Sequence, residues 1–196
     1  MSTSESTTIT KTGVTAPPQP GRWVADPSHS TIAASTRHLM ITKVRGRFDS
    51  FSATVDVADD PTRSTVDVSI DAKSINTNDA GRDGHLRSPD FLAVDEHPQL
   101  AFTSTGIEHV EDDRYRLTGD LTIRGVTKPV VLDVDYFGIT PDPWGSQRAL
   151  FRATTQLERE NWDITWNVAL ETGGVLVGKK LDVEIELQLV PEQPAS

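Results

Sequence analysis

The chain has 196 residues, with 19 Lys and Arg against 29 Asp and Glu, so its formal net charge is −10. This acidic balance disfavours nucleic acids and anionic membrane surfaces as partners, because both would repel the protein. The absence of cysteine excludes disulfides, thiolate nucleophiles and iron–sulfur clusters. No apolar run approaches the roughly 20 residues of an integral membrane segment.

The two ends differ from the rest of the chain. Residues 1–20 are rich in Ser, Thr and Pro, a composition that predicts a disordered tail. They contain no apolar stretch of the kind found in secretory signals, so we expect a cytoplasmic protein. Residues 191–196 are expected to form a short C-terminal tail, which leaves residues 21–190 as one folded domain.

The folded part alternates apolar and polar residues, the pattern of strands with one buried face. Residues 65–72 and 180–189 show it most clearly, and one or two further strands are expected within residues 23–36. Because one wet face suits antiparallel sheets, we expect about eight or nine mostly antiparallel strands. The remaining segments with this pattern are residues 51–57, 100–107, 115–123, 130–136 and 149–157.

Residues 78–94 break the alternation and predict a helical insert. Ser88 and Pro89 resemble a helix start, with Ser88 as the N-cap and Pro89 in the first position. We therefore expect one short helix before Ser88 and another after it.

Many strands and one helical insert favour an all-β fold, either a closed barrel or a sandwich. The small inward-facing residues favour an eight-stranded antiparallel barrel that leaves room for one ligand. The sequence thus predicts an elongated apolar cavity of roughly several hundred Å³. The small residues are Ala34, Ala53, Ala72, Gly119, Ala149 and Ala153.

Motifs for cofactors or metals find little support. Residues 173–180 read GGVLVGKK, which resembles a phosphate loop but lacks its Ser or Thr and precedes a strand, so a glycine turn is favoured. The five histidines do not have the close spacing of a zinc site. We expect neither a cofactor nor a metal.

The densest polar cluster covers residues 82–87, with the sequence RDGHLR. One interpretation is a general acid–base group in which Asp83 orients His85. The other is a hydrogen-bonded network that holds the helical insert on the barrel rim, and this structural interpretation is favoured.

Several motifs together resemble the YceI-like lipid/polyisoprenoid-binding family over residues 21–190. They are Asp26-Pro27-x-His29-Ser30, the run from Arg82 to Phe91, and the run from Gly119 to Pro129. The resemblance implies a lipocalin-like barrel that holds a long isoprenoid or similar lipid, such as an isoprenoid quinone or polyprenyl compound, and it implies no catalytic residue. The chain departs from the family at Ala34 and Thr36, and where Asp163 replaces a glycine.

The favoured function is therefore non-enzymatic binding of such a lipid, for storage or transport, and a homodimer is left open. Two alternatives are an enzyme that acts on a lipid-like substrate with His85 and Asp83 at the rim, and a stress-related protein with a packed barrel. The expected ligand-binding residues are Ile32, Phe48, Phe51, Val55, Val68, Ile70, Leu86, Phe91, Leu92, Phe102, Leu117, Leu121, Leu132, Ile185 and Leu187.

Overall fold

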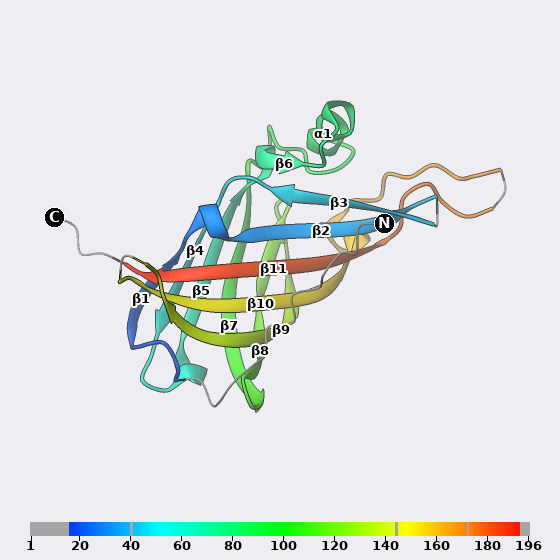
Figure 1. The fold of residues 1–196 in the computed structure, drawn as a ribbon. Coiled ribbons are helices and arrows are strands. Elements are labelled where there is room, and N and C mark those ends of the chain that lie inside the picture. Colours follow the sequence, from blue (N-terminus) through cyan, green and yellow to red (C-terminus); the bar gives the residue numbers. More distant parts are fainter. Residues whose placement is uncertain (1–15, 40, 144, 172, 193–196) are drawn as a thin grey trace, which may run out of the picture.

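The computed structural model describes residues 16–39, 41–143, 145–171 and 173–192. They form a closed eight-stranded antiparallel barrel, which confirms the expected fold (Figure 1). β1 closes the barrel because it pairs with β4 on one side and β11 on the other. The barrel strands, in spatial order, are β1 (Gly21–Ala25), β4 (Phe51–Val57), β5 (Thr65–Asp71), β7 (Gln99–Glu111), β8 (Arg114–Ile123), β9 (Val126–Pro141), β10 (Gln147–Glu158) and β11 (Lys180–Pro191).

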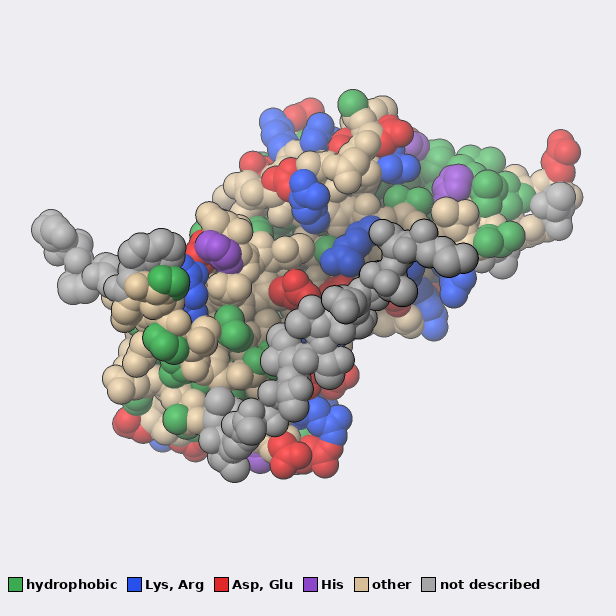
Figure 2. Space-filling view, in the orientation of Figure 1, with side chains coloured by type: hydrophobic (Ala, Val, Ile, Leu, Met, Phe, Trp, Pro, Cys, Tyr) green, Lys and Arg blue, Asp and Glu red, His purple; other side chains and the backbone are tan. Residues whose placement is uncertain are grey.

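Three more strands continue the sheet beyond β11: β2 (Thr31–His38), β3 (Thr42–Phe48) and the two-residue β6 (Ile75–Asn76). The sequence did not predict β3, because its apolar face consists only of Val44, Gly46 and Phe48. Hydrophobic side chains gather at the right of Figure 2, where the β2–β3 hairpin ends. Ile41 at its tip is 82% exposed.

The helical insert holds one α-helix, α1 (Ala80–Arg87), above one end of the barrel (Figure 1). Asp79 caps it by accepting a hydrogen bond from the Arg82 amide. The second expected helix is absent, and Ser88 is a C-cap instead of an N-cap. The Ser88 carbonyl accepts hydrogen bonds from the amides of Phe91 and Ala93, so the chain turns after α1.

Four short 3₁₀ helices complete the secondary structure: η1 (Pro27–His29), η2 (Pro61–Arg63), η3 (Ala72–Ser74) and η4 (Arg159–Trp162). Residues 173 and 174 are glycines with positive φ in a turn, and no helix lies between them and β11, as the turn interpretation predicted. Among the described residues, no helix is long and apolar enough to cross a membrane.

The barrel interior contains two hydrophobic clusters. The larger includes Phe91, Phe102 and Trp162 and lies toward the α1 end. The smaller centres on Trp23, Tyr136, Ala149 and Leu189. The η2 end of the barrel is the opposite end, where β4 leads through η2 into β5.

Gly119 in β8 makes room for the ring of Phe102 in the neighbouring strand β7. A Cβ atom at Gly119 would lie 2.3 Å from Phe102 Cζ and 2.6 Å from the Thr103 carbonyl oxygen. The space that a small residue here seemed to leave for a ligand is therefore filled by Phe102.

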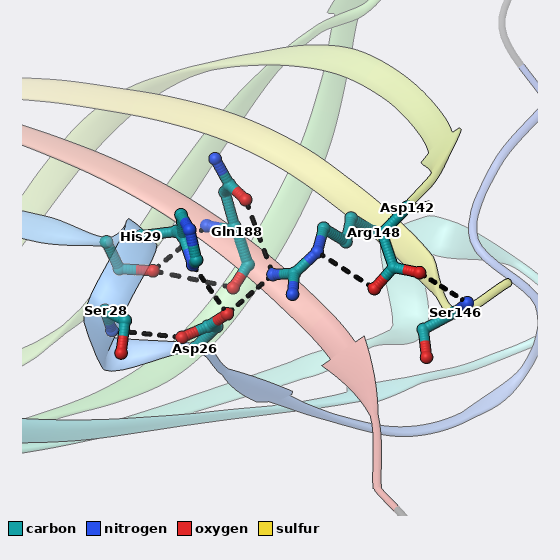
Figure 3. A network of polar contacts seen from close by, with 8 residues as sticks. Asp26, Ser28, His29, Asp142, Ser146, Arg148 and Gln188 are labelled. Atoms are coloured by element: carbon teal, nitrogen blue, oxygen red, sulfur yellow. Dashed lines mark hydrogen bonds and ion pairs between the residues drawn. The ribbon is translucent and has the colours of Figure 1, made fainter. Parts of the chain in front are cut away.

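A polar network holds the corner between β1 and β2 (Figure 3). Arg148 in β10 donates to Asp26 Oδ2 at 2.6 Å, and His29 Nδ1 lies 2.9 Å from the same oxygen. The Ser30 hydroxyl accepts from the Gln188 amide. The hydrogen bond from Arg148, followed by those from His29 and Ser28, lowers the pKa of Asp26 from 3.8 to about 2.

We predict that Gly119→Ala lowers the free energy of unfolding by roughly 1–3 kcal/mol, because the new methyl overlaps the Phe102 ring. Chemical denaturation would measure it. Phe102→Leu in the same chain should recover part of the loss, because it removes the overlapping ring atoms. A Gly119→Ala protein as stable as the native chain would contradict this packing.

We predict a pH-dependent contribution from Asp26. Its pKa is lower in the folded state than in the unfolded chain, so the network stabilises fully above about pH 4 and weakens as the pH falls towards 2. Urea denaturation between pH 2 and 6 should therefore show that the free energy of unfolding falls less steeply with decreasing pH in Asp26→Asn than in the native chain. The same slope in both proteins would contradict it, and Asp95→Asn, at a side chain 92% exposed, is the control.

Candidate functional site

The candidate site is an apolar cavity of about 130 Å³ inside the barrel, toward its η2 end. It lies where the two core clusters meet, and seven of the eight barrel strands contribute to its wall. Among the described residues, no charged side chain lines it. The lining residues are Pro17, Pro18, Val55, Val57, Pro61, Ser64, Val66, Ile107, Tyr115, Leu117, Val134, Tyr136, Phe151, Ala153, Ile185, Leu187 and Leu189.

Residues 16–20, which we call the strap, close the cavity at the η2 end. The Tyr136 hydroxyl donates to the Ala16 carbonyl at 2.8 Å, and Trp23 Nε1 donates to the Gln19 carbonyl at 2.9 Å. Pro17 and Pro18 face the cavity. This part of the expected tail therefore contacts the barrel, whereas residues 1–15 lie outside the described residues.

The C-terminal end also differs slightly from expectation. β11 extends to Pro191, which is in register with Trp23, and the Glu192 amide donates to the Arg22 carbonyl. Residues 193–196 lie outside the described part of the chain.

The α1 end of the barrel is packed shut. Phe91 and Trp162 are 8% and 2% exposed, and Leu86 and Leu92 pack against the same cluster. The His85 ring forms edge contacts with Phe91 and Trp166, at centroid distances of 4.9 and 4.6 Å. The insert residues therefore seal the barrel at the end opposite the cavity.

The fifteen expected ligand-binding residues all belong to the two clusters, but only four line the cavity: Val55, Leu117, Ile185 and Leu187. The other eleven pack in the larger cluster: Ile32, Phe48, Phe51, Val68, Ile70, Leu86, Phe91, Leu92, Phe102, Leu121 and Leu132. Alternation identified inward faces, yet it could not tell which end of each strand is packed. The strap prolines and Tyr136 carried no signal as ligand-binding residues.

The cavity is smaller than the several hundred Å³ expected from the sequence. Of the small residues, only Ala153 lines it, whereas Ala53, Ala72 and Ala149 pack elsewhere in the interior. Ala34 is half-buried and outside the lining. Thr36 lies outside it too, with its hydroxyl bonded to the Lys180 carbonyl at 3.0 Å.

The polar cluster of the insert does not form the Asp83–His85 pair of the alternative, acid–base interpretation. Asp83 is 7% exposed and its Oδ1 accepts hydrogen bonds from the Thr77 amide at 2.8 Å and hydroxyl at 2.6 Å. His85 Nε2 instead lies 2.9 Å from Asp90 Oδ2. The acid–base arrangement weighed from the sequence is therefore wrong, whereas Asp83 does tie α1 to the segment before it.

Arg159 is a buried cation at the α1 end, 2% exposed. Its Nε and Nη1 donate to the carbonyls of Gly178 and Ile164, and Nη2 has no hydrogen-bond partner among the described residues. Burial lowers its pKa. Nearby, Asp163 adopts φ 58° and ψ 22°, so it keeps the left-handed turn that the family glycine provides.

Tyr136 is the main polar group at the cavity. It is 2% exposed, and burial, together with the neighbouring Tyr115 and Asp113, raises its pKa to about 12. At neutral pH it therefore keeps its proton and acts as a hydrogen-bond donor.

We predict that Asp83→Ala lowers the free energy of unfolding by about 1–3 kcal/mol, because two buried donors of Thr77 lose their acceptor. Asp90→Ala, which removes only a half-exposed partner of His85, should cost less than about 1 kcal/mol. Denaturation of both variants tests this. Equal losses in the two would contradict the structural role of Asp83.

Taken together, the fold and cavity define a small closed antiparallel barrel with an apolar space in its interior. The YceI-like domain model matches residues 23–189, and the chain belongs to that family. It is 38% identical over 164 residues to a UPF0312 protein of Staphylococcus aureus strain MSSA476, covering 82% of this chain and 91% of the relative. A UPF0312 protein of Pectobacterium atrosepticum is 42% identical over 138 residues, or 70% and 71% of the two chains.

Solved structures agree with the fold. The Campylobacter jejuni YceI protein has a TM-score of 0.68 at 28% identity, over 80% of this chain and 90% of that chain. BcnA of Burkholderia cenocepacia has a TM-score of 0.72 at 20% identity, over 84% and 98%. A polyisoprenoid-binding domain from Saccharophagus degradans has a TM-score of 0.67 at 13% identity, over 87% and 98%.

Proposed function

We propose that the protein binds a long-chain lipid in the barrel interior and performs no chemistry on it. The observation that carries this proposal is the apolar cavity in the barrel interior, whose wall has no charged side chain among the described residues. Apolar contact alone can supply the affinity, since each buried carbon contributes about 0.8 kcal/mol before ordering costs.

An isoprenoid, of the quinone or polyprenyl type, is the ligand class that we propose, for storage or transport. A family neighbour described as a polyisoprenoid-binding domain supports this choice. Ligand pockets usually reach 300–1,000 Å³, so a long chain requires the 130 Å³ space to widen. Displacement of the strap and rearrangement of the small aliphatic side chains beside it would provide that widening.

The test uses a bulky residue in the cavity wall. We predict that Ala153→Phe reduces binding of the fluorescent apolar probe N-phenyl-1-naphthylamine by tenfold or more, because the ring fills most of the space. The matched control is Thr154→Phe, which puts the same ring on the outer face of the same strand. Mass spectrometry of organic extracts from both purified variants should find the co-purified lipid only with Thr154→Phe.

Two outcomes would contradict the proposal. Unchanged probe binding in a folded Ala153→Phe protein would place the lipid elsewhere. Conversion of an added prenyl lipid by the native protein would show an enzyme.

A further inference from the structure

The strap resembles a bound ligand in the way it contacts the barrel. It presents one carbonyl oxygen, that of Ala16, to a buried hydroxyl, and two apolar rings, those of Pro17 and Pro18, to an apolar wall. A lipid with a small polar head has the same two parts. The Tyr136 hydroxyl is thus occupied by an acceptor from the protein's own chain.

The strap is held weakly compared with the rest of the barrel. All its residues are exposed except Pro18, which is half-buried, and two side-chain hydrogen bonds anchor it. The segment pairs with no strand, because β1 begins at Gly21. Local opening of such a segment costs far less than opening packed strands.

The lining restricts the kind of head that could replace the Ala16 carbonyl. Tyr136 donates a hydrogen bond, and none of the described residues that line the cavity is a Lys, Arg or His that could balance a negative charge. Burying an unpaired carboxylate or phosphate here would be costly.

We propose that the strap occupies the head position of the lipid site, and that the site takes a lipid whose head is a neutral hydrogen-bond acceptor, a carbonyl or hydroxyl, bound to Tyr136 in place of Ala16. This inference rests on the proposed lipid-binding function. The strap must leave for the head to bind, so it competes with every ligand. The Tyr136 hydroxyl selects among lipids because it stabilises only a head group that accepts its hydrogen bond.

The experiment uses four ligands that share one C15 isoprenoid chain: farnesal, farnesol, ionised farnesoic acid and the hydrocarbon farnesene. Each competes with N-phenyl-1-naphthylamine for the full chain at pH 7.5. We expect farnesal and farnesol to bind roughly tenfold or more tightly than farnesoate, since the carboxylate finds no cation.

Two variants measure separately the hydrogen bond to the lipid head and the competition by the strap. Tyr136→Phe should reduce the affinity of farnesal relative to farnesene by about 3- to 10-fold, the effect of one hydrogen bond. Thr154→Val, which removes a hydroxyl on the outer face of β10 and outside the cavity lining, is the control and should leave this ratio unchanged. The double variant Pro17→Gly/Pro18→Gly should raise the affinity of all four ligands and preserve the farnesal-to-farnesene ratio.

The outcomes that overturn the inference differ from those that overturn lipid binding. A ratio unchanged in Tyr136→Phe, or farnesoate bound as tightly as farnesal, would refute the head assignment while lipid binding stands. If Tyr136→Phe does not fold, the test is the double variant Pro17→Gly/Pro18→Gly. An unchanged affinity for farnesene in that variant would refute the claim that the strap competes with the ligand. Failure of all four ligands to bind both the native chain and the strap variant would refute the proposed function itself.

Discussion

Barrel closure depends on β11, whose two edges carry different partners. One edge pairs with β10 from Glu158 to Ala149, and the other pairs first with β2 and then with β1. The chain crosses from β1 to β2 at a corner beside Gln188, where Arg148 and Asp26 form a charge-assisted hydrogen bond. Without this corner, one strand could not both close the barrel and carry the β2–β3 extension. Closure also leaves the barrel strands without a free edge and directs alternate side chains inward.

The interior is filled unevenly along the barrel. Toward the α1 end, aromatic rings such as those of Phe102 and Trp162 fill the bore, and Gly119 supplies the gap that the Phe102 ring needs. Where the two clusters meet, the rings of Tyr136 and Phe151 lie in the wall together with small side chains such as Ala153, and a cavity remains between them. The two ends are also closed differently. Buried Asp83 and Thr77 fix the insert, whereas two hydrogen bonds hold the exposed strap.

The strands could be predicted from the sequence because alternation reports directly on inward and outward faces. Residues 180–189 show this, and β3 shows the limit, because a glycine in the middle of its apolar face weakens the pattern. The position of the cavity could not be predicted, since it depends on how rings from different strands share the bore. Ala72 is small but fully buried by packing, whereas Ala153 lines the space. The role of Tyr136 depends on a contact across 120 residues, which local sequence does not encode.

Access to the interior follows from the difference between the two ends. Opening at α1 would expose Phe91 and Trp162, which are almost fully buried, and would separate Asp83 from Thr77. Opening at the strap breaks two hydrogen bonds to carbonyls that water can then satisfy. In the proposed binding mode, a lipid that enters there passes its apolar chain first, toward Leu117 and Ile185, and leaves its head beside Tyr136. In this mode the head replaces the acceptor that the Tyr136 hydroxyl loses when the strap leaves, so that no buried donor remains unsatisfied.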